Sequence, residues 1–317
     1  MIKTISIIGL GKLGLPIAKV FSRHYKVIGI DKIKTKGYTT SYTDLGDITF
    51  VVVPTPSDSY NRFSSQYVEE VLNKIHKKQI IVIVSTLMPR ETDRLQKKYK
   101  HLTLIYNPTF VALGTVAYDF THPDIILIGG KGRRIIFTLL DIYSVVLKSF
   151  PYFALLTPLE AEIVKLALNC YITTKITFAN QIGNLCYSLD INPDNILNAI
   201  GKDSRIGNKY FKAGLGYGGP CFPRDNLAMA EFMQDNGLYP QLNETMHNLN
   251  KRQIAEMVYR IERLNPKSIG FESLSYKKGS DVTEHSQLKA IWEKLKEDGY
   301  KVKMGKGEIN IDWEGIK

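Results

Sequence analysis

The chain is poor in cysteine and has no long apolar run. Its three cysteines among 317 residues are an odd number without CxxC spacing, which argues against a disulfide framework and a structural zinc site. No run approaches the roughly 20 apolar residues that a helix needs to cross a bilayer. The first apolar run, Ile5–Ile8, leads into a glycine turn without a cleavage-like sequence, so we interpret it as a strand and not a signal peptide. We expect a cytoplasmic protein with no membrane partner and no metal.

Acidic residues are also in the minority. There are 31 of them against 42 lysines and arginines, which gives a formal net charge of +11. This balance favours an anionic ligand, either a nucleic acid or a nucleotide, although a dispersed basic surface without a single target would look the same. With 44% hydrophobic and 23% charged residues, the composition is that of a folded chain and not of a disordered one. The length of 317 residues predicts about two domains of roughly 150 residues each.

Short apolar runs recur through the first half, and most alternate with polar or helical stretches. Several are apolar on both faces, which is typical of a parallel sheet covered by helices on each side. We therefore predict an α/β domain over residues 1–156. The seven runs are Ile5–Ile8, Val27–Ile30, Ile48–Val53, Ile80–Val84, Leu102–Tyr106, Ile125–Ile128 and Tyr152–Leu156.

The pattern changes at Thr157, where Thr-Pro-Leu-Glu has the form of a capping box. Apolar residues at helical spacing then continue to about Leu189, which predicts a helix of roughly 30 residues and about 45 Å. We interpret it as a spine linking two lobes or two subunits. A mostly helical segment completes a central domain, residues 157–264, and Asn265-Pro266 marks its end.

The last fifty or so residues, 265–317, predict only a strand, a helix and a second strand. These are Ser268–Phe271, a helix near Ser286–Asp298, and Tyr300–Met304. That is too little for a complete α/β domain, so we expect a shortened C-terminal one.

A glycine motif follows the first strand and opens an amphipathic helix. The spacing GxGxxG suits a tight turn, close approach of a pyrophosphate, and close helix–strand packing. Asp31 ends the next strand, 17 residues after Gly14. A carboxylate there accepts hydrogen bonds from ribose hydroxyls and repels a 2′-phosphate. A Rossmann-like domain that prefers NAD over NADP is predicted. The motif residues are Gly9, Leu10, Gly11, Lys12, Leu13 and Gly14.

A second glycine-rich stretch, Gly214–Gly219, precedes Cys221. Four glycines in six residues would let the backbone wrap closely around a ligand, and the cysteine lies where a helix is expected to begin. Helix N-termini favour a reactive thiolate. Asp225 follows one helical turn later, whereas Cys170 and Cys186 lie on the long helix and are interpreted as core residues.

Together these motifs resemble the UDP-glucose/GDP-mannose (nucleotide-sugar 6-) dehydrogenase family over nearly the whole chain. The stretch ending in Cys221 and Asp225 resembles the family's nucleophile loop. Residues 160–169 resemble the segment with the catalytic lysine and asparagine, here Lys165 and Asn169, which are spaced i, i+4 on one helix face.

The resemblance implies further site residues. Cofactor contacts fall on Val53, Pro54, Thr55, Ser85 and Thr86, and Thr86 is also assigned to catalysis. Substrate contacts fall on Thr109, Phe110, Val111, Lys165, Asn169, Arg205, Tyr217, Gly218 and Lys277, with Arg205 reaching the site of a neighbouring subunit.

Three positions depart from the family pattern. Thr109 stands where the general-base glutamate is usual, Leu113 replaces a second glutamate, and Glu284 replaces an arginine. The family's C-terminal nucleotide-binding domain is represented here by about half its usual length.

The implied reaction is a four-electron oxidation of a nucleotide-sugar C6 alcohol to a carboxylate by a homodimer, with two NAD and one water. UDP-glucose is the commonest family substrate, so UDP-glucuronate is the expected product. One alternative is a degenerate member that binds NAD or nucleotide sugar without completing the oxidation. Another is a basic nucleic-acid-binding protein, but the chain lacks a zinc motif, RNP-like aromatics and a recognition helix, so we expect no nucleic-acid partner.

Overall fold

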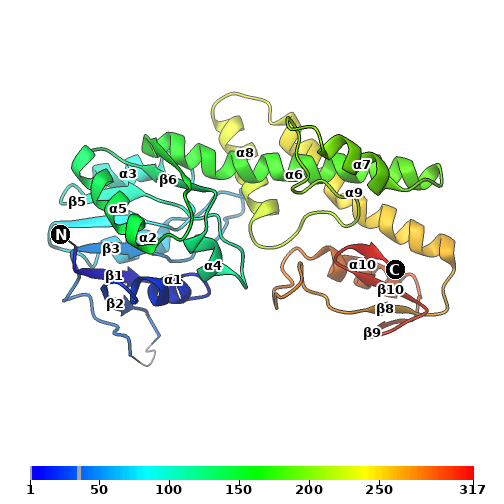
Figure 1. Ribbon diagram of the computed structural model, residues 1–317, viewed down its shortest axis with the longest axis horizontal. Coiled ribbons are helices and arrows are strands. Elements are labelled where there is room, and N and C mark those ends of the chain that lie inside the picture. The colour runs from blue at the N-terminus through cyan, green and yellow to red at the C-terminus, as the bar shows by residue number, and fades with distance from the viewer. Residues whose placement is uncertain (1, 34–36) are drawn as a thin grey trace. The chain divides into compact units, whose positions relative to one another are not determined.

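A computed structural model describes residues 2–33 and 37–317. The chain forms two compact units, Met1–Lys165 and Leu166–Lys317, and their boundary falls within the continuous helix α6 (Pro158–Ser188) (Figure 1). The predicted division into residues 1–156, 157–264 and 265–317 stays a prediction. No helix in the described ranges is both long and apolar enough to cross a membrane.

The first unit contains a seven-stranded sheet in the order β2-β1-β3-β4-β5-β6-β7. Every predicted apolar run forms one of its strands. They are β1 (Thr4–Ile8), β2 (Lys26–Ile30), β3 (Ile48–Val51), β4 (Gln79–Ile83), β5 (Leu102–Tyr106), β6 (Ile125–Gly129) and β7 (Tyr152–Leu156). The strand order reverses between β1 and β3, and open α/β sheets bind ligands at the carboxyl end of such a switch point.

The sheet is parallel from β2 to β5 and again between β6 and β7, but these two groups meet in an antiparallel pair, Tyr106 with Gly129. The prediction of a parallel sheet is wrong at that junction. A short run that is apolar on both faces looks the same in either direction, so the sequence carried no signal for the strand's orientation.

Helices cover both faces of this sheet, as predicted. The helices α1 (Gly14–Phe21), α4 (Val116–Thr121) and α5 (Arg133–Val146) share one apolar cluster with it. On the opposite face lie α2 (Gln66–Leu72), α3 (Glu91–Lys98) and the first turns of α6. The Rossmann-like fold class is confirmed.

The start of α6 has the predicted capping box. The Glu160 carboxylate accepts hydrogen bonds from the Thr157 backbone N–H at 2.8 Å and from its hydroxyl at 2.7 Å. The Glu160 N–H donates back to the Thr157 hydroxyl at 3.4 Å, and such reciprocal bonds satisfy donors that a helix N-terminus otherwise leaves unpaired. The predicted long helix is confirmed, with bounds within one residue of those expected.

The second unit continues with α7 (Pro193–Gly201), α8 (Phe222–Asp235) and α9 (Gln241–Leu264), and ends in a small sheet with α10 (Gln287–Glu297). That sheet has the order β11-β10-β8-β9, formed by β8 (Ile269–Phe271), β9 (Val302–Met304), β10 (Ile309–Asp312) and β11 (Gly315–Ile316). One apolar cluster joins α9, α10, β8 and β10.

The prediction of only two strands after Leu264 is wrong, because β10 and β11 are also present. In β10 the isoleucines alternate with Asn310 and Asp312, residue types that are depleted in strands. Its pairing with β8 through Ile309, Asn310 and Ile311 supplies the stability that local preference does not.

Candidate functional site

The glycine turn after β1 has room for a ligand. Gly9 has φ +92° and its N–H donates to the Ile30 carbonyl at 2.9 Å. A Cβ on Gly14 would lie 1.8 Å from the Gly9 oxygen, whereas a Cβ on Gly11 would meet nothing within 4 Å. The first turn of α1 carries no acidic side chain. An open backbone surface at an uncapped helix N-terminus fits a pyrophosphate.

Asp31 is fixed against this turn. Its carboxylate accepts from the Leu10 N–H at 2.5 Å and from the Ile33 N–H at 3.1 Å. Two bonds leave further lone pairs on the carboxylate, enough to accept from ribose hydroxyls. Neighbouring Lys32 is paired with Glu70 at 3.0 Å, so its charge is already matched. This arrangement supports the predicted preference for a cofactor without a 2′-phosphate.

The turns after β3 and β4 are tied together by Ser85. Its hydroxyl accepts from the Val53 N–H at 2.9 Å and donates to the Val53 carbonyl at 2.7 Å. Thr55 is buried, and Thr86 is half-buried. The Ser85 hydroxyl thus stabilises the rim of the predicted site, while the cofactor contacts of these turns stay a prediction.

Lys165 lies beside the loop that follows β5. The lysine is buried, and its ammonium donates to the Thr109 carbonyl at 3.0 Å and lies 4.6 Å from the centre of the Phe110 ring. A cation over an aromatic face is stabilised by the ring quadrupole. The structure therefore brings Lys165 to two other predicted site residues, Thr109 and Phe110, that precede it by more than fifty positions. Val111 and Leu113 are half-buried in the same loop.

Glu162, which sequence reasoning did not single out, caps another helix. Its fully buried carboxylate accepts from the Arg90 N–H at 2.7 Å, the Thr92 N–H at 2.7 Å and the Thr92 hydroxyl at 2.6 Å. Arg90 is the N-cap residue of α3 and has φ +78°. The cap that α3 lacks locally is therefore supplied by α6, and no local sequence signal could indicate it.

We expect Glu162 to make the stability of the first unit pH-dependent. Burial raises its pKa to about 7 despite the three hydrogen bonds that favour the charged form. Because the folded pKa lies above the ordinary value of 4.5, the folded state holds the proton longer. The contribution of Glu162 to the free energy of unfolding is therefore fully present below about pH 4.5. It is lost as the pH rises toward 8, which lowers the free energy of unfolding by up to about 3 kcal/mol.

The measurement is urea unfolding from pH 5 to pH 8 on the wild-type protein and on Glu162→Gln, which does not titrate. The difference between their unfolding free energies should shift against the wild type as the pH rises. A constant difference across this range would contradict the raised pKa.

In the second unit, Asn169 and Asp225 are joined directly. The Asn169 amide donates to the Asp225 carboxylate at 2.5 Å, and both side chains are buried. Cys221 is the N-cap residue of α8, and its carbonyl accepts the Asp225 N–H at 2.8 Å. The three predicted residues are thus linked, and the helix start expected at Cys221 is confirmed.

The other two cysteines differ from Cys221 in exposure. Cys186 is buried and Cys170 largely so, whereas Cys221 is exposed. Burial and the nearby Asp225 charge raise the pKa of the Cys170 thiol to about 12, so it is protonated at neutral pH. Cys221 is therefore the accessible thiol of the chain.

The glycines before Cys221 are packed closely against other parts of the protein, while the predicted wrapping of this backbone around a ligand stays a prediction. A Cβ on any of the four would lie only 2.2–2.9 Å from another part of the protein. Gly218 faces the His285 carbonyl, and Gly219, with φ +81°, faces the Tyr276 ring. Protein packing alone therefore requires glycine here, and wrapping around a ligand is not needed to explain these residues.

A cavity of about 250 Å³ lies within the second unit, next to this loop. Sequence reasoning missed it, because its residues come from separate segments. The aromatic rings of Tyr210, Phe211, Tyr276 and Trp313 line it, with Lys212. Tyr210 has φ +60°, an uncommon conformation for a bulky residue that often marks a functional site.

The remaining predicted substrate residues, Arg205, Tyr217 and Lys277, lie in the second unit. Arg205 is exposed and pairs with Asp203 at 2.7 Å. Lys277 is half-buried, and Tyr217 is buried with no hydrogen-bond partner for its hydroxyl. Their contacts with substrate stay predictions. Within the described ranges, no group of three or more histidine, cysteine, aspartate or glutamate side chains could hold a metal ion.

Two sequence models of one family match the chain. The NAD binding domain of the UDP-glucose/GDP-mannose dehydrogenase family matches residues 34–147, and its central domain matches residues 159–252. The chain belongs to this family. The predicted resemblance is confirmed, and so is NAD as the cofactor.

Individual relatives agree with this assignment. The chain is 32% identical over 270 residues to a UDP-glucose 6-dehydrogenase of Rickettsia bellii, covering 81% of this chain and 62% of the relative. It is 29% identical over 285 residues to a UDP-glucose 6-dehydrogenase of Haloferax volcanii, covering 82% and 66%. The chain thus spans somewhat less than two thirds of the length of these curated relatives.

A solved structure of a UDP-glucose dehydrogenase from Pyrobaculum islandicum is also similar, with a TM-score of 0.86 and 27% identity. The match covers 99% of this chain and 83% of that one. The fold expected from the motifs of this dehydrogenase family is therefore confirmed along almost the whole chain.

Proposed function

We propose that this family member oxidises the C6 alcohol of a nucleotide sugar to a carboxylate, with UDP-glucose as substrate and UDP-glucuronate as product. The observation that carries the proposal is the exposed Cys221 at the start of α8, with Asp225 one turn later and bonded to Asn169. A pure binding protein has no need for an accessible thiol in this setting. The alternative of a member that only binds its ligands is therefore not favoured.

The cavity beside the glycine loop supports a nucleotide as the recognised group. Aromatic rings stack on a base, and the basic residue of the lining, Lys212, is already paired with Glu314 at 3.8 Å. The choice of uracil rests on the names of the relatives, which are UDP-glucose 6-dehydrogenases.

The residues around the first glycine turn fit NAD. The open surface at Gly11 would accept the pyrophosphate, and Asp31 would accept from the ribose hydroxyls. Bound NAD supplies the hydride acceptor for both oxidations. The protein's own residues position the substrate and manage protons.

In the proposed first oxidation, the C6 hydroxyl gives up its proton and the C6 carbon gives up a hydride, for which bound NAD would be the acceptor. Lys165, Asn169 and a water held by Asp225 stabilise the developing oxyanion. The Cys221 thiolate then adds to the aldehyde carbon, and the thiohemiacetal loses a second hydride to become a thioester. Water cleaves the carbon–sulfur bond and restores the thiol. Two NAD and one water thus yield a carboxylate, two NADH and three protons.

The test is a panel of UDP-, GDP- and N-acetylated sugar nucleotides with NAD, counting NADH formed per sugar consumed. Two NADH per UDP-glucose and a uronate product are expected. NAD binding without NADH formation on any member of the panel would favour the binding-only alternative. Salt-dependent binding to DNA, in place of turnover, would favour the nucleic-acid-binding alternative.

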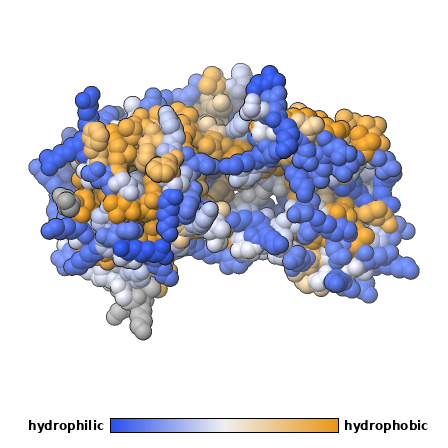
Figure 2. Space-filling model, in the orientation of Figure 1, coloured by the Kyte–Doolittle hydropathy of each residue, from blue (hydrophilic) through white to orange (hydrophobic). Residues whose placement is uncertain are grey.

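We further propose a cytoplasmic homodimer, in which α6 carries the contact. Three exposed side chains on this helix, Tyr171, Phe178 and Leu185, are spaced at seven residues and so lie along one side of it. Figure 2 shows hydrophobic side chains over α7 and the C-terminal half of α6. A second copy of this chain would cover such a stripe.

Leu185→Glu is therefore expected to shift the protein from dimer to monomer at micromolar concentration, because it places a charge in the apolar contact. Sedimentation velocity measures this. Leu155→Glu is the matched control, since Leu155 is about equally exposed but lies on β7 of the first unit. A monomeric wild type would refute the dimer, and an equally dimeric Leu185→Glu variant would refute a contact through this side of α6.

A further inference from the structure

Three buried amide side chains hold the backbone of the glycine loop. Asn180 of α6 accepts from the Gly214 N–H at 2.8 Å and donates to the Leu215 carbonyl at 3.1 Å. Gln253 of α9 donates to the Gly214 carbonyl at 2.8 Å. These bonds fix the start of the loop from two helices.

The third amide fixes the end of the loop. Asn250 of α9 accepts from the Tyr217 N–H at 2.8 Å and donates back to the Tyr217 carbonyl at 2.9 Å. Both backbone groups of one residue are thus held by a single side chain. Gly216, directly before it, approaches the same amide so closely that a Cβ would lie 2.2 Å from the Asn250 oxygen.

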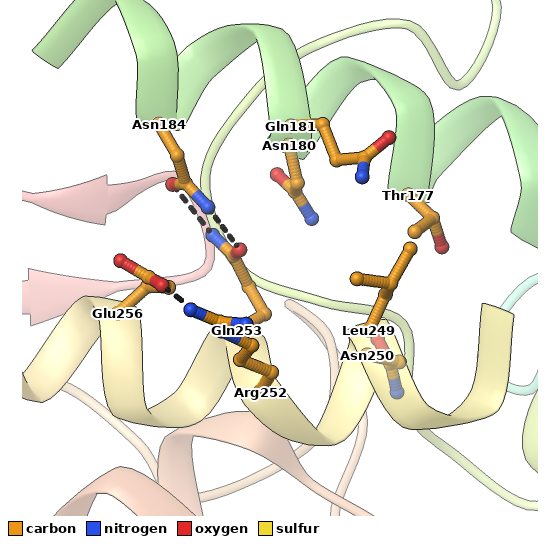
Figure 3. A pocket seen from close by; sticks show the side chains of 9 residues that line it. All are labelled: Thr177, Asn180, Gln181, Asn184, Leu249, Asn250, Arg252, Gln253 and Glu256. Carbon is orange, nitrogen blue, oxygen red and sulfur yellow. Dashed lines mark hydrogen bonds and ion pairs between the residues drawn. The ribbon is translucent and has the colours of Figure 1, made fainter. Parts of the chain in front are cut away.

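The two helices also brace the amides. Asn184 of α6 donates to the Gln253 oxygen at 2.9 Å, so the side chain that holds Gly214 is itself oriented (Figure 3). These residues line a cavity of about 240 Å³ between α6 and α9. The amide groups of Asn180, Asn250 and Gln253 already have partners on both the donor and acceptor sides, so the cavity offers little unused capacity for a ligand.

We propose that Asn180, Asn250 and Gln253 form an amide clamp that positions Cys221 for the oxidation. The segment between Tyr217 and Cys221 is short, and the Gly219 N–H in its middle donates to the Glu284 carbonyl at 3.1 Å. With Tyr217 held by Asn250 and Cys221 held at the start of α8, the thiol has little freedom to move. The three amides are positioning residues, and their catalytic role rests on the proposed function.

The loss of a buried hydrogen-bond partner leaves backbone groups unsatisfied. We therefore expect Asn250→Ala to raise hydrogen exchange at the Tyr217 amide by about 100-fold and to lower kcat by at least about tenfold. The KM for NAD should stay within about twofold of the wild-type value, because the expected NAD contacts lie in the first unit. Asn184→Ala, one step removed from the loop, should give a smaller effect. Gln181→Ala is the control, since Gln181 lines the same cavity but is exposed.

A second readout does not depend on the proposed function. Site-resolved alkylation with iodoacetamide should slow at Cys221 by at least about threefold in Asn250→Ala relative to Gln181→Ala, because helix starts stabilise thiolates and the loosened thiol leaves that position. If no sugar nucleotide is oxidised, the proposed function fails, but exchange and alkylation still decide whether the clamp exists.

Asn250→Asp is a second variant that tests the proposal even if Asn250→Ala does not fold, because aspartate has nearly the same size as asparagine. Its ionised carboxylate accepts from the Tyr217 N–H but repels the Tyr217 carbonyl, and protonation at lower pH restores a donor. Its alkylation rate, relative to the wild type at each pH, should therefore recover as the pH falls. Wild-type exchange and alkylation in both Asn250 variants would overturn the proposal.

Discussion

Cys221→Ser should abolish carboxylate formation while NAD still binds with an unchanged Kd. Cys221 is the exposed cysteine of the chain and the N-cap residue of α8, although its thiol makes no capping hydrogen bond. The N-terminus of a helix favours a thiolate. A serine hydroxyl has no comparable anion at neutral pH, so addition to the aldehyde should fall by at least about 10⁴-fold. The expected NAD contacts lie on other elements, so the cofactor should still bind.

The measurement is uronate formation, followed by mass spectrometry of the product, with NAD affinity measured separately by calorimetry. Cys186→Ala is the control, because it removes a buried thiol of α6 that has no part in the proposed reaction. Normal uronate production by the serine variant would refute the role of Cys221.

Local signals predicted much of the fold. The seven apolar runs became the seven strands of the first sheet, and the Thr157 capping box set the start of α6. Local sequence also predicted the glycine turn after β1 and the start of α8 at Cys221. In each of these, the residues that determine the structure are within a few positions of one another.

Features set by distant residues could not be predicted in this way. The antiparallel junction of β5 and β6 and the strand β10 depend on pairing with other strands. The buried amides of Asn180 and Gln253 look like ordinary polar helix residues until the loop that they hold is in place. The cavity with Tyr210 and Trp313 likewise exists only after separate segments come together.

Lys165 and Thr109 show how a predicted site residue can keep its position and differ in its chemistry. The carbonyl of Thr109 accepts the Lys165 ammonium, so the loop is anchored by its backbone whatever the side chain is. The side chain, by contrast, determines whether a base is present. A threonine hydroxyl cannot accept a proton from water as a carboxylate does, and such assistance is typically worth about 10²–10⁴-fold.

Release of the acyl group from Cys221 should therefore be the slow step of turnover. In the proposed mechanism the oxidations use Lys165, Asn169, Asp225 and Cys221, which are all present. Hydrolysis of the thioester would lack its base, because Thr109 stands where the family resemblance implies a glutamate. We expect a burst approaching two NADH per active site, followed by a slow phase. During the slow phase, Cys221 should carry an adduct with the mass of the substrate less four hydrogens.

Thr109→Glu should accelerate the slow phase by at least about tenfold, because it places a carboxylate on the loop beside Lys165. Thr109→Gln is the matched control: it has nearly the same size as glutamate but cannot act as a base, so its slow phase should stay that of the wild type. Rapid quench followed by intact-protein mass spectrometry measures the adduct directly. Linear NADH formation from the first turnover, with no adduct on Cys221, would mean that another group of the protein activates the water.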